Sequence, residues 1–147
     1  DWRVHGMLGQ ALSQKSLPGA IDALRTAHRL APRVGQVAFA LASELRKSGS
    51  EPSSASDAAE AAGLYRIAIK LAPALGDAKT YLNLGMALTD STRTAPAADN
   101  DDSGGVGDDD EAVAAWSVAA ALAPGWVDAP LLSAMRLASG GKAQRKR

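Results

Sequence analysis

Hydrophobic residues recur along this chain with the spacing of α-helices. In three segments, an Ala is followed by a large apolar residue four positions on, by a second Ala three positions later, and then by Leu-Ala-Pro. The segments align without gaps and cover Ala20–Pro32, Ala61–Pro73 and Ala112–Pro124. Such spacings place the apolar residues on one helix face. The pattern therefore predicts three helices, each ending just before its proline, because proline lacks an N–H and clashes with the preceding turn.

A second pattern precedes each of these segments. A Leu is followed by a small residue and then, three positions later, by another Leu: Leu8-Gly9 with Leu12, Leu41-Ala42 with Leu45, and Leu84-Gly85 with Leu88. Gly in a helix interior costs about 1 kcal/mol relative to Ala, and it is retained where another helix must pack at short distance. We therefore expect pairs of antiparallel helices, with Trp116, the large residue of the third stripe, in the core.

Composition supports an all-α chain. Of the 147 residues, 46% are hydrophobic but only 4% aromatic, and 32 are Ala. Small side chains of high helix propensity favour closely packed helices over a sheet with a bulky core. The length corresponds to one modest domain. The chain has no Cys, which excludes disulfides, thiolate metal sites and cysteine nucleophiles.

The paired pattern resembles the tetratricopeptide repeat, a helix-turn-helix unit of about 34 residues. The resemblance covers three divergent repeats, about 1–32, 33–73 and 74–124, followed by an expected terminal helix at 127–138. It implies an all-α solenoid of stacked antiparallel helix pairs wound into a right-handed superhelix. The sequence departs from the family in its proline spacings of 41 and 51 residues and in lacking the usual aromatic of the first helix.

The extra length is assigned to two insertions between the helices of a repeat. Residues 49–56 and 90–107 are rich in turn formers and poor in large apolar residues, so we expect flexible loops. The basic tail at 139–147 is read as a disordered, solubilising terminus, with contact to an acidic partner, RNA or lipid as the alternative. The acidic run Asp108–Glu111 favours the start of a helix, with a cation or basic-partner site as the alternative.

Motifs for catalysis are missing from the sequence. The two histidines, His5 and His28, fall on different predicted helices without metal-ligand spacing, and no phosphate-binding loop or nucleophile elbow is present. We expect no catalytic, cofactor-binding or metal-binding residue, and we expect the chain not to be an enzyme. A net charge of zero and a pI near 6.9 argue against a nucleic-acid binder. The sequence contains no run of about 18 apolar residues, so no membrane span is predicted.

The family resemblance also implies a concave groove lined by the first helix of each repeat. Its candidate partner-binding residues are Met7, Gln10, Phe39, Ser43, Asn83 and Met86. In many such repeats an Asn one place before the Leu-small pair binds the backbone of an extended peptide. Only Asn83 matches this position, since Met7 and Ala40 occupy it in the other repeats, so an asparagine ladder is not supported. A groove of Met, Phe and Ala suits an apolar or helical segment, unless the terminal helix partly fills it.

The sequence thus predicts a noncatalytic scaffold that binds a peptide or helical segment of a partner protein in the groove. Because the chain opens at Asp1 rather than Met, the alternative is the substrate-selecting repeat region of a larger enzyme, such as a glycosyltransferase or hydroxylase. An RNA-binding repeat ranks last, because the groove positions are mostly neutral. We expect a soluble chain, compatible with the cytoplasm, that binds a protein or peptide partner. The sequence assigns neither the compartment nor the oligomeric state.

Overall fold

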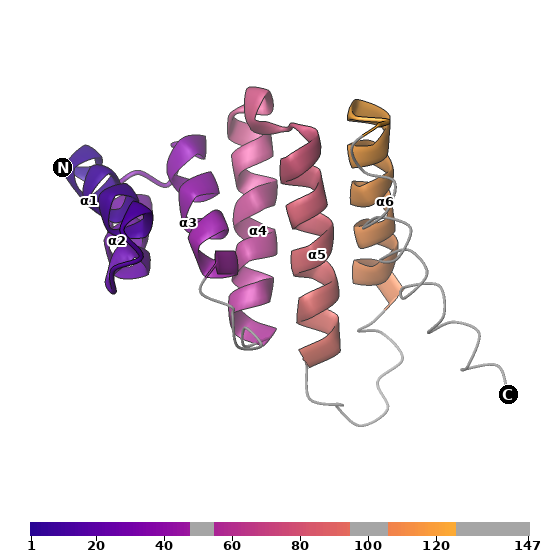
Figure 1. The fold of residues 1–147 in the computed structure, drawn as a ribbon, viewed down its shortest axis with the longest axis horizontal. Helices are drawn as coiled ribbons and strands as arrows, with labels where there is room; N and C mark the ends of the chain where they lie inside the picture. Colours follow the sequence, from indigo (N-terminus) through magenta and orange to yellow (C-terminus); the bar gives the residue numbers. More distant parts are fainter. Residues whose placement is uncertain (48–54, 95–105, 126–147) are drawn as a thin grey trace, which may run out of the picture.

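The computed structural model describes residues 1–47, 55–94 and 106–125. These residues form helices and connecting turns without strands. The helices are α1 (Trp2–Gln14), α2 (Ala20–Leu30), α3 (Gly35–Lys47), α4 (Ala55–Leu71), α5 (Ala78–Thr94) and α6 (Val106–Leu122), with a 3-10 turn at Pro73–Leu75. Each α-helix packs against the next one along the chain. The result is an α-solenoid of stacked antiparallel helix pairs, as predicted (Figure 1).

The helix ends follow the prolines. Helices α2, α4 and α6 end at Leu30, Leu71 and Leu122, each two residues before its proline, which confirms the prediction. Helix α5 continues to Thr94, into the segment expected as an insertion. Its hydroxyl side chains bond to backbone carbonyls of the same helix, as Thr89 does to Gly85 at 3.0 Å, and polar residues satisfied in this way remain compatible with a helix.

The other edges of the expected insertions are helical as well. Helix α4 begins at Ala55 and α6 at Val106, so each includes the last two residues of an expected loop. The remainder of both insertions, the expected terminal helix at 127–138 and the tail at 139–147 lie outside the described residues. Their assignments therefore stay predictions.

Within a repeat, the small residue of the first helix receives the large residue of the second. A Cβ built on Gly9 would lie 2.6 Å from Cγ of Leu24, and one built on Gly85 would overlap the indole of Trp116. Both large side chains are buried, with exposed fractions of 2% and 1%. The small residues after Leu therefore set the close approach of paired helices, as the sequence predicted.

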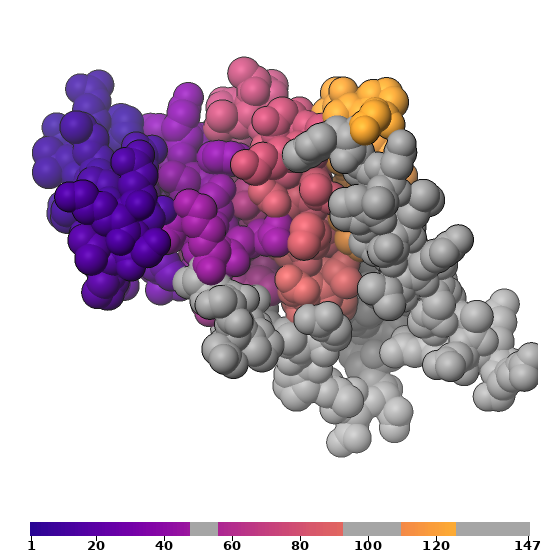
Figure 2. Space-filling view, in the orientation of Figure 1, coloured from indigo at the N-terminus to yellow at the C-terminus, as the bar shows by residue number. Residues whose placement is uncertain are grey.

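The hydrophobic core is concentrated in the second and third repeats. Its buried members come from α3 to α6, joined by a single residue of the first repeat, Leu24. Helix α1 packs along α2 but makes few contacts with α3. In Figure 1 the first pair is inclined away from the row formed by α4, α5 and α6, and Figure 2 shows one face of this stack. Two hollows lie between α1 and α3.

Candidate functional site

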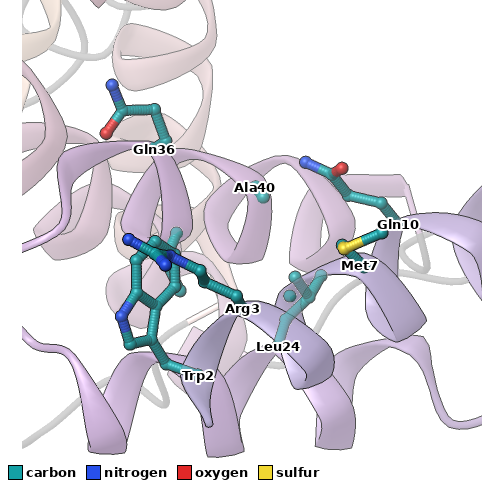
Figure 3. A pocket seen from close by; sticks show the side chains of 9 residues that line it. Trp2, Arg3, Met7, Gln10, Leu24, Gln36 and Ala40 are labelled. Carbon is teal, nitrogen blue, oxygen red and sulfur yellow. The ribbon is translucent and has the colours of Figure 1, made fainter.

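A groove runs between α1 and α3. It consists of two hollows, of about 270 Å³ and 450 Å³, that share Gln10, Leu24, Gln36 and Ala40. The first hollow is also lined by Trp2, Arg3, Gly6, Met7 and Val37 (Figure 3). The second is also lined by Ser13, Gln14, Phe39, Ser43, Glu44, Lys47 and Leu75. Because the two hollows share four residues, we describe them as one groove.

The floor of the first hollow is apolar. Leu24 and Val37 are buried beneath it, whereas Met7 on its wall is 71% exposed. Gly6 contributes no side chain, and a Cβ built there would meet nothing within 4 Å. Glycine in a helix interior costs about 1 kcal/mol relative to Ala. Close packing explains that cost at Gly9 but not at Gly6, where the missing side chain leaves the hollow open.

Amide groups lie along the walls of the groove. Gln10 on α1 and Gln36 on α3 are both exposed, and Figure 3 shows their side chains on different walls of the first hollow. Each amide offers a hydrogen-bond acceptor and two donor hydrogens. The groove therefore combines an apolar floor with polar groups able to orient a bound ligand, an arrangement common in binding sites.

A polar cluster joins α1 to α3 in the second hollow. The hydroxyl of Ser13 donates to the carboxylate of Glu44 at 2.5 Å, and Nζ of Lys47 donates to Oγ of Ser13 at 3.1 Å. Lys47 also lies 3.6 Å from Glu44, whose side chain is only 14% exposed. The cluster ties the last turn of α1 to α3.

The structure brings four of the six predicted groove residues together. Met7 and Gln10 line the first hollow, and Gln10, Phe39 and Ser43 line the second. The ring of Phe39 also packs edge-on against Tyr65, with centroids 6.0 Å apart. The remaining two residues lie on α5, outside the lining of these hollows.

Asn83 and Met86 are the two residues on α5. Oδ1 of Asn83 accepts a hydrogen bond from Nη1 of Arg46 at 2.6 Å, so one side of its amide is already engaged. The side chain of Met86 is 38% exposed. A ligand that reached these two residues would have to extend beyond the hollows between α1 and α3.

Sequence reasoning missed Trp2, Arg3, Gly6 and Gln36. Arg3 and Gln36 lie four residues before Met7 and Ala40, so helical spacing extended by one turn would have found both. The guanidinium of Arg3 lies 5.5 Å from the ring centroid of Trp2. Gly6 gives no signal of its own, because it acts through the side chain that it lacks.

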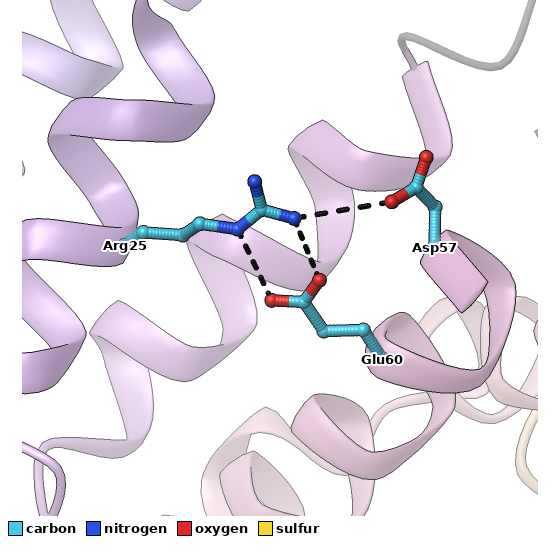
Figure 4. Close-up of polar contacts among 3 residues, drawn as sticks. All are labelled: Arg25, Asp57 and Glu60. Carbon is cyan, nitrogen blue, oxygen red and sulfur yellow. Dashed lines mark hydrogen bonds and ion pairs between the residues drawn. The ribbon is translucent and has the colours of Figure 1, made fainter. Parts of the chain in front are cut away.

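Two bidentate ion pairs join the second helices of successive repeats. Arg25 on α2 binds Glu60 on α4 through Nε at 3.3 Å and Nη2 at 2.7 Å, with Asp57 3.8 Å away (Figure 4). Arg66 on α4 binds Glu111 on α6 in the same way, through Nε at 2.6 Å and Nη2 at 2.5 Å. We call this pair of contacts the arginine ladder.

The arginine ladder occupies equivalent positions of the repeats. Both arginines follow the large stripe residue, and both glutamates directly precede the first Ala of the stripe. In the first repeat the glutamate position is Gly19, and in the third the arginine position is Ser117. The side chains are 36% to 44% exposed, where ion pairs contribute little stability. The ladder therefore contributes little to stability, although it bridges the second helices of successive repeats at equivalent positions.

Tyr65 is the buried titratable group of the core. Burial raises the pKa of its phenol above the ordinary value of 10.0, against smaller opposing effects that begin with the hydrogen bond to Ser43. The phenol donates to Oγ of Ser43 at 3.4 Å. The folded state thus favours the neutral form of Tyr65.

Within the part of the chain that the structure describes, no three His, Cys, Asp or Glu side chains gather as a metal site would require. His5 and His28 lie on α1 and α2, the separate helices predicted for them. No described helix is both long and apolar enough to cross a membrane.

The fold places the chain in a structural class, the α-solenoids of stacked antiparallel helix pairs. No family model matches the sequence, and no curated protein sequence matches it. Among solved structures, the chain is similar to MamA. One MamA crystal structure aligns with a TM-score of 0.67 at 19% identity, covering 99% of this chain and 66% of that chain. A second gives a TM-score of 0.66 at 19% identity, with 99% and 70% covered. At this identity the likeness shows the fold.

Proposed function

We propose that the chain is a divergent tetratricopeptide array that acts as a noncatalytic interaction scaffold, and that the groove between α1 and α3 holds a peptide or helical segment of a partner protein. The observation that carries this proposal is the open hollow beside Gly6. The glycine weakens α1 where packing does not require it, and the space it leaves is lined by apolar side chains and free amide edges.

The chemistry of the groove favours an apolar segment. Burial of apolar surface contributes about 25 cal/mol per Å². In the first hollow, Met7, which is 71% exposed, supplies such surface beside a floor formed by the buried Leu24 and Val37. Met7 is unbranched and flexible, so it can adapt to the shape of a ligand. The amides of Gln10 and Gln36 would hydrogen-bond backbone groups of the bound segment and fix its direction.

Filling the first hollow tests this proposal. Gly6→Leu places a side chain in the open space, whereas Gly63→Leu adds one on α4, where a Cβ likewise meets nothing within 4 Å and which is not part of the groove lining. Both changes replace glycine by a strong helix former, so their effects on helix stability are matched.

The readout is affinity capture with quantitative mass spectrometry after chemical crosslinking. We expect a partner that is enriched by the native chain and by Gly63→Leu and is lost with Gly6→Leu, while circular dichroism shows all three chains folded. Equal capture of the same partners by the two variants would place the binding surface outside the first hollow and overturn the proposal.

A further inference from the structure

Three leucines are exposed at one position of the repeat. Leu30, Leu71 and Leu122 belong to the three Leu-Ala-Pro triplets and are 54%, 41% and 54% exposed. Each follows by three residues an Ala with an exposed fraction of 0%, namely Ala27, Ala68 or Ala119. Because the second helices stack in order, these leucines recur along the edge of the solenoid where those helices end (Figure 1).

The same edge carries cations without ion-pair partners among the described residues. Arg29 and Lys70 directly precede Leu30 and Leu71, and Arg33 follows Pro32. All three are exposed, and none forms an ion pair within the described ranges. By contrast, the cations of the arginine ladder are both engaged by carboxylates. We name Leu30, Leu71 and Leu122, with Arg29, Arg33 and Lys70, the leucine edge.

The described acids on this edge have other roles. Oδ1 of Asp77 accepts hydrogen bonds from the backbone N and Oγ1 of Thr80, both at 2.8 Å, and Asp1 accepts from the backbone N of Arg3 at 3.0 Å. Both carboxylates thus cap helix N-termini. Asp57, Glu60 and Glu111 belong to the opposite edge, where the second helices begin. A net charge of zero for the whole chain therefore conceals a basic, apolar edge.

We propose that the leucine edge docks an extended or helical segment of a partner protein in which acidic residues alternate with apolar ones. Its apolar side chains would cover the leucines, and its carboxylates would pair with Arg29 and Lys70. Because the position equivalent to Arg29 and Lys70 is Ala121 in the third repeat, the acidic part of the segment lies over the first two repeats. The charge difference along the edge fixes the direction of binding.

The geometry favours a linear protein segment over a lipid surface. Each leucine is about half covered, and the edge presents helix ends rather than a helix lying flat. A helix that binds at a bilayer surface buries an apolar face about 5–10 Å deep. A single row of half-exposed leucines matches the side chains of one chain laid along it. This site is distinct from the groove, which lies between first helices.

Peptide display tests the leucine edge with ligands of random sequence. Random peptides are selected for binding to the native chain, and the recovered peptides are titrated against variants. We expect peptides rich in Asp and Glu next to apolar residues, whose affinity falls about tenfold or more with Leu30→Ser/Leu71→Ser and weakens with added salt. Val4→Ser/Leu8→Ser is the matched control, since it removes two exposed apolar side chains from α1.

Three results would overturn the proposal: selected peptides without acidic enrichment, equal loss of affinity in the control, or unchanged affinity in the leucine variant. Vesicles with and without phosphatidylserine form a separate arm, and binding of the anionic vesicles that depends on Leu30 and Leu71 would identify a lipid surface and contradict a protein segment. Gly6→Leu should leave the selected peptides bound, so failure of this proposal is distinguishable from failure of the groove proposal.

Discussion

The junction between the first and second repeats differs from that between the second and third. Helices α4 and α5 pack closely and share the continuous core, whereas the equivalent helices of the first junction, α2 and α3, pack less extensively. The repeats also differ at one position next to these junctions. Two residues before the Leu-small pair, α3 carries Phe39 and α5 carries Leu82, both packed against the core, but α1 carries Gly6, whose Cβ position is empty. Beside the groove, the first repeat thus lacks a side chain that the second and third repeats have at this position.

The largest effect is expected inside the third repeat, within the continuous core. Trp116→Ala removes an indole that is 1% exposed and should lower the free energy of unfolding by roughly 3–5 kcal/mol, because lost transfer energy adds to the cost of a cavity. Chemical denaturation followed by circular dichroism measures this loss. An unchanged midpoint would contradict the assignment of Trp116 to the core.

The next largest losses of stability are expected from replacing the small residues with larger ones. Gly85→Ala places a Cβ against the Trp116 indole, and Gly9→Ala places one 2.6 Å from Cγ of Leu24. Overpacking costs about 1–3 kcal/mol. We expect the larger loss at Gly85, because a leucine side chain can move more readily than a buried indole. A stabilising effect at Gly85, measured by thermal melting, would show that α5 and α6 have room to separate.

At the first junction, replacing a third glycine is expected to stabilise the fold rather than to destabilise it. Gly6→Ala should raise the free energy of unfolding by up to about 1 kcal/mol, because it improves helix propensity without a clash. The same substitution destabilises at Gly9, three residues further along α1. If denaturant titration finds both variants destabilised, the hollow beside Gly6 is not open in solution.

Alkaline pH probes the hydrophobic core through Tyr65. Because burial raises the pKa of this phenol in the folded state, the unfolded chain loses its proton first. Stability is therefore unaffected below about pH 10 and falls as the pH rises through that value. Tyr65→Phe should show a smaller loss of stability between neutral and strongly alkaline pH in denaturation curves. Identical losses in both chains would contradict burial of the phenol.

Removing the arginine ladder should give the smallest loss of stability, and the loss should be similar at both junctions. Arg25→Ala and Arg66→Ala are each expected to cost less than about 1 kcal/mol, because both pairs are exposed to solvent. Double-mutant cycles with Glu60→Ala and Glu111→Ala should give similar coupling energies. A coupling energy in only one cycle would show that the two pairs are not equivalent in solution.

The sequence predicted the helices of the described residues better than it predicted the groove. Prolines and the Leu-small pairs carry strong local signals, so helix ends and the contact of Gly85 with Trp116 could be read from spacing. The extension of α5 was missed because hydroxyl residues resemble a loop until their bonds to the helix backbone are seen. Gly6 was missed because its role depends on the space between α1 and α3, which no residue pattern records.

The arginine ladder could have been found. Arg25 and Arg66 share one position of the aligned segments, and Glu60 and Glu111 share another, so comparing charged positions between repeats would have indicated it. The leucine edge was equally visible as Leu-Ala-Pro, but the triplet alone does not say that its leucines remain exposed. Exposure follows from how the repeats stack, and that is a property of the fold.

Site-specific photocrosslinking tests the groove most directly. A photoreactive residue replaces Met7 in the groove or, as a control, Ala59, which is exposed on α4, and crosslinked partner peptides are identified by mass spectrometry. The account predicts that position 7 crosslinks to one segment of a partner protein and that Gly6→Leu abolishes this product, while position 59 yields none of it. A product of equal yield from both positions, or one that persists with Gly6→Leu, would contradict recognition in the groove.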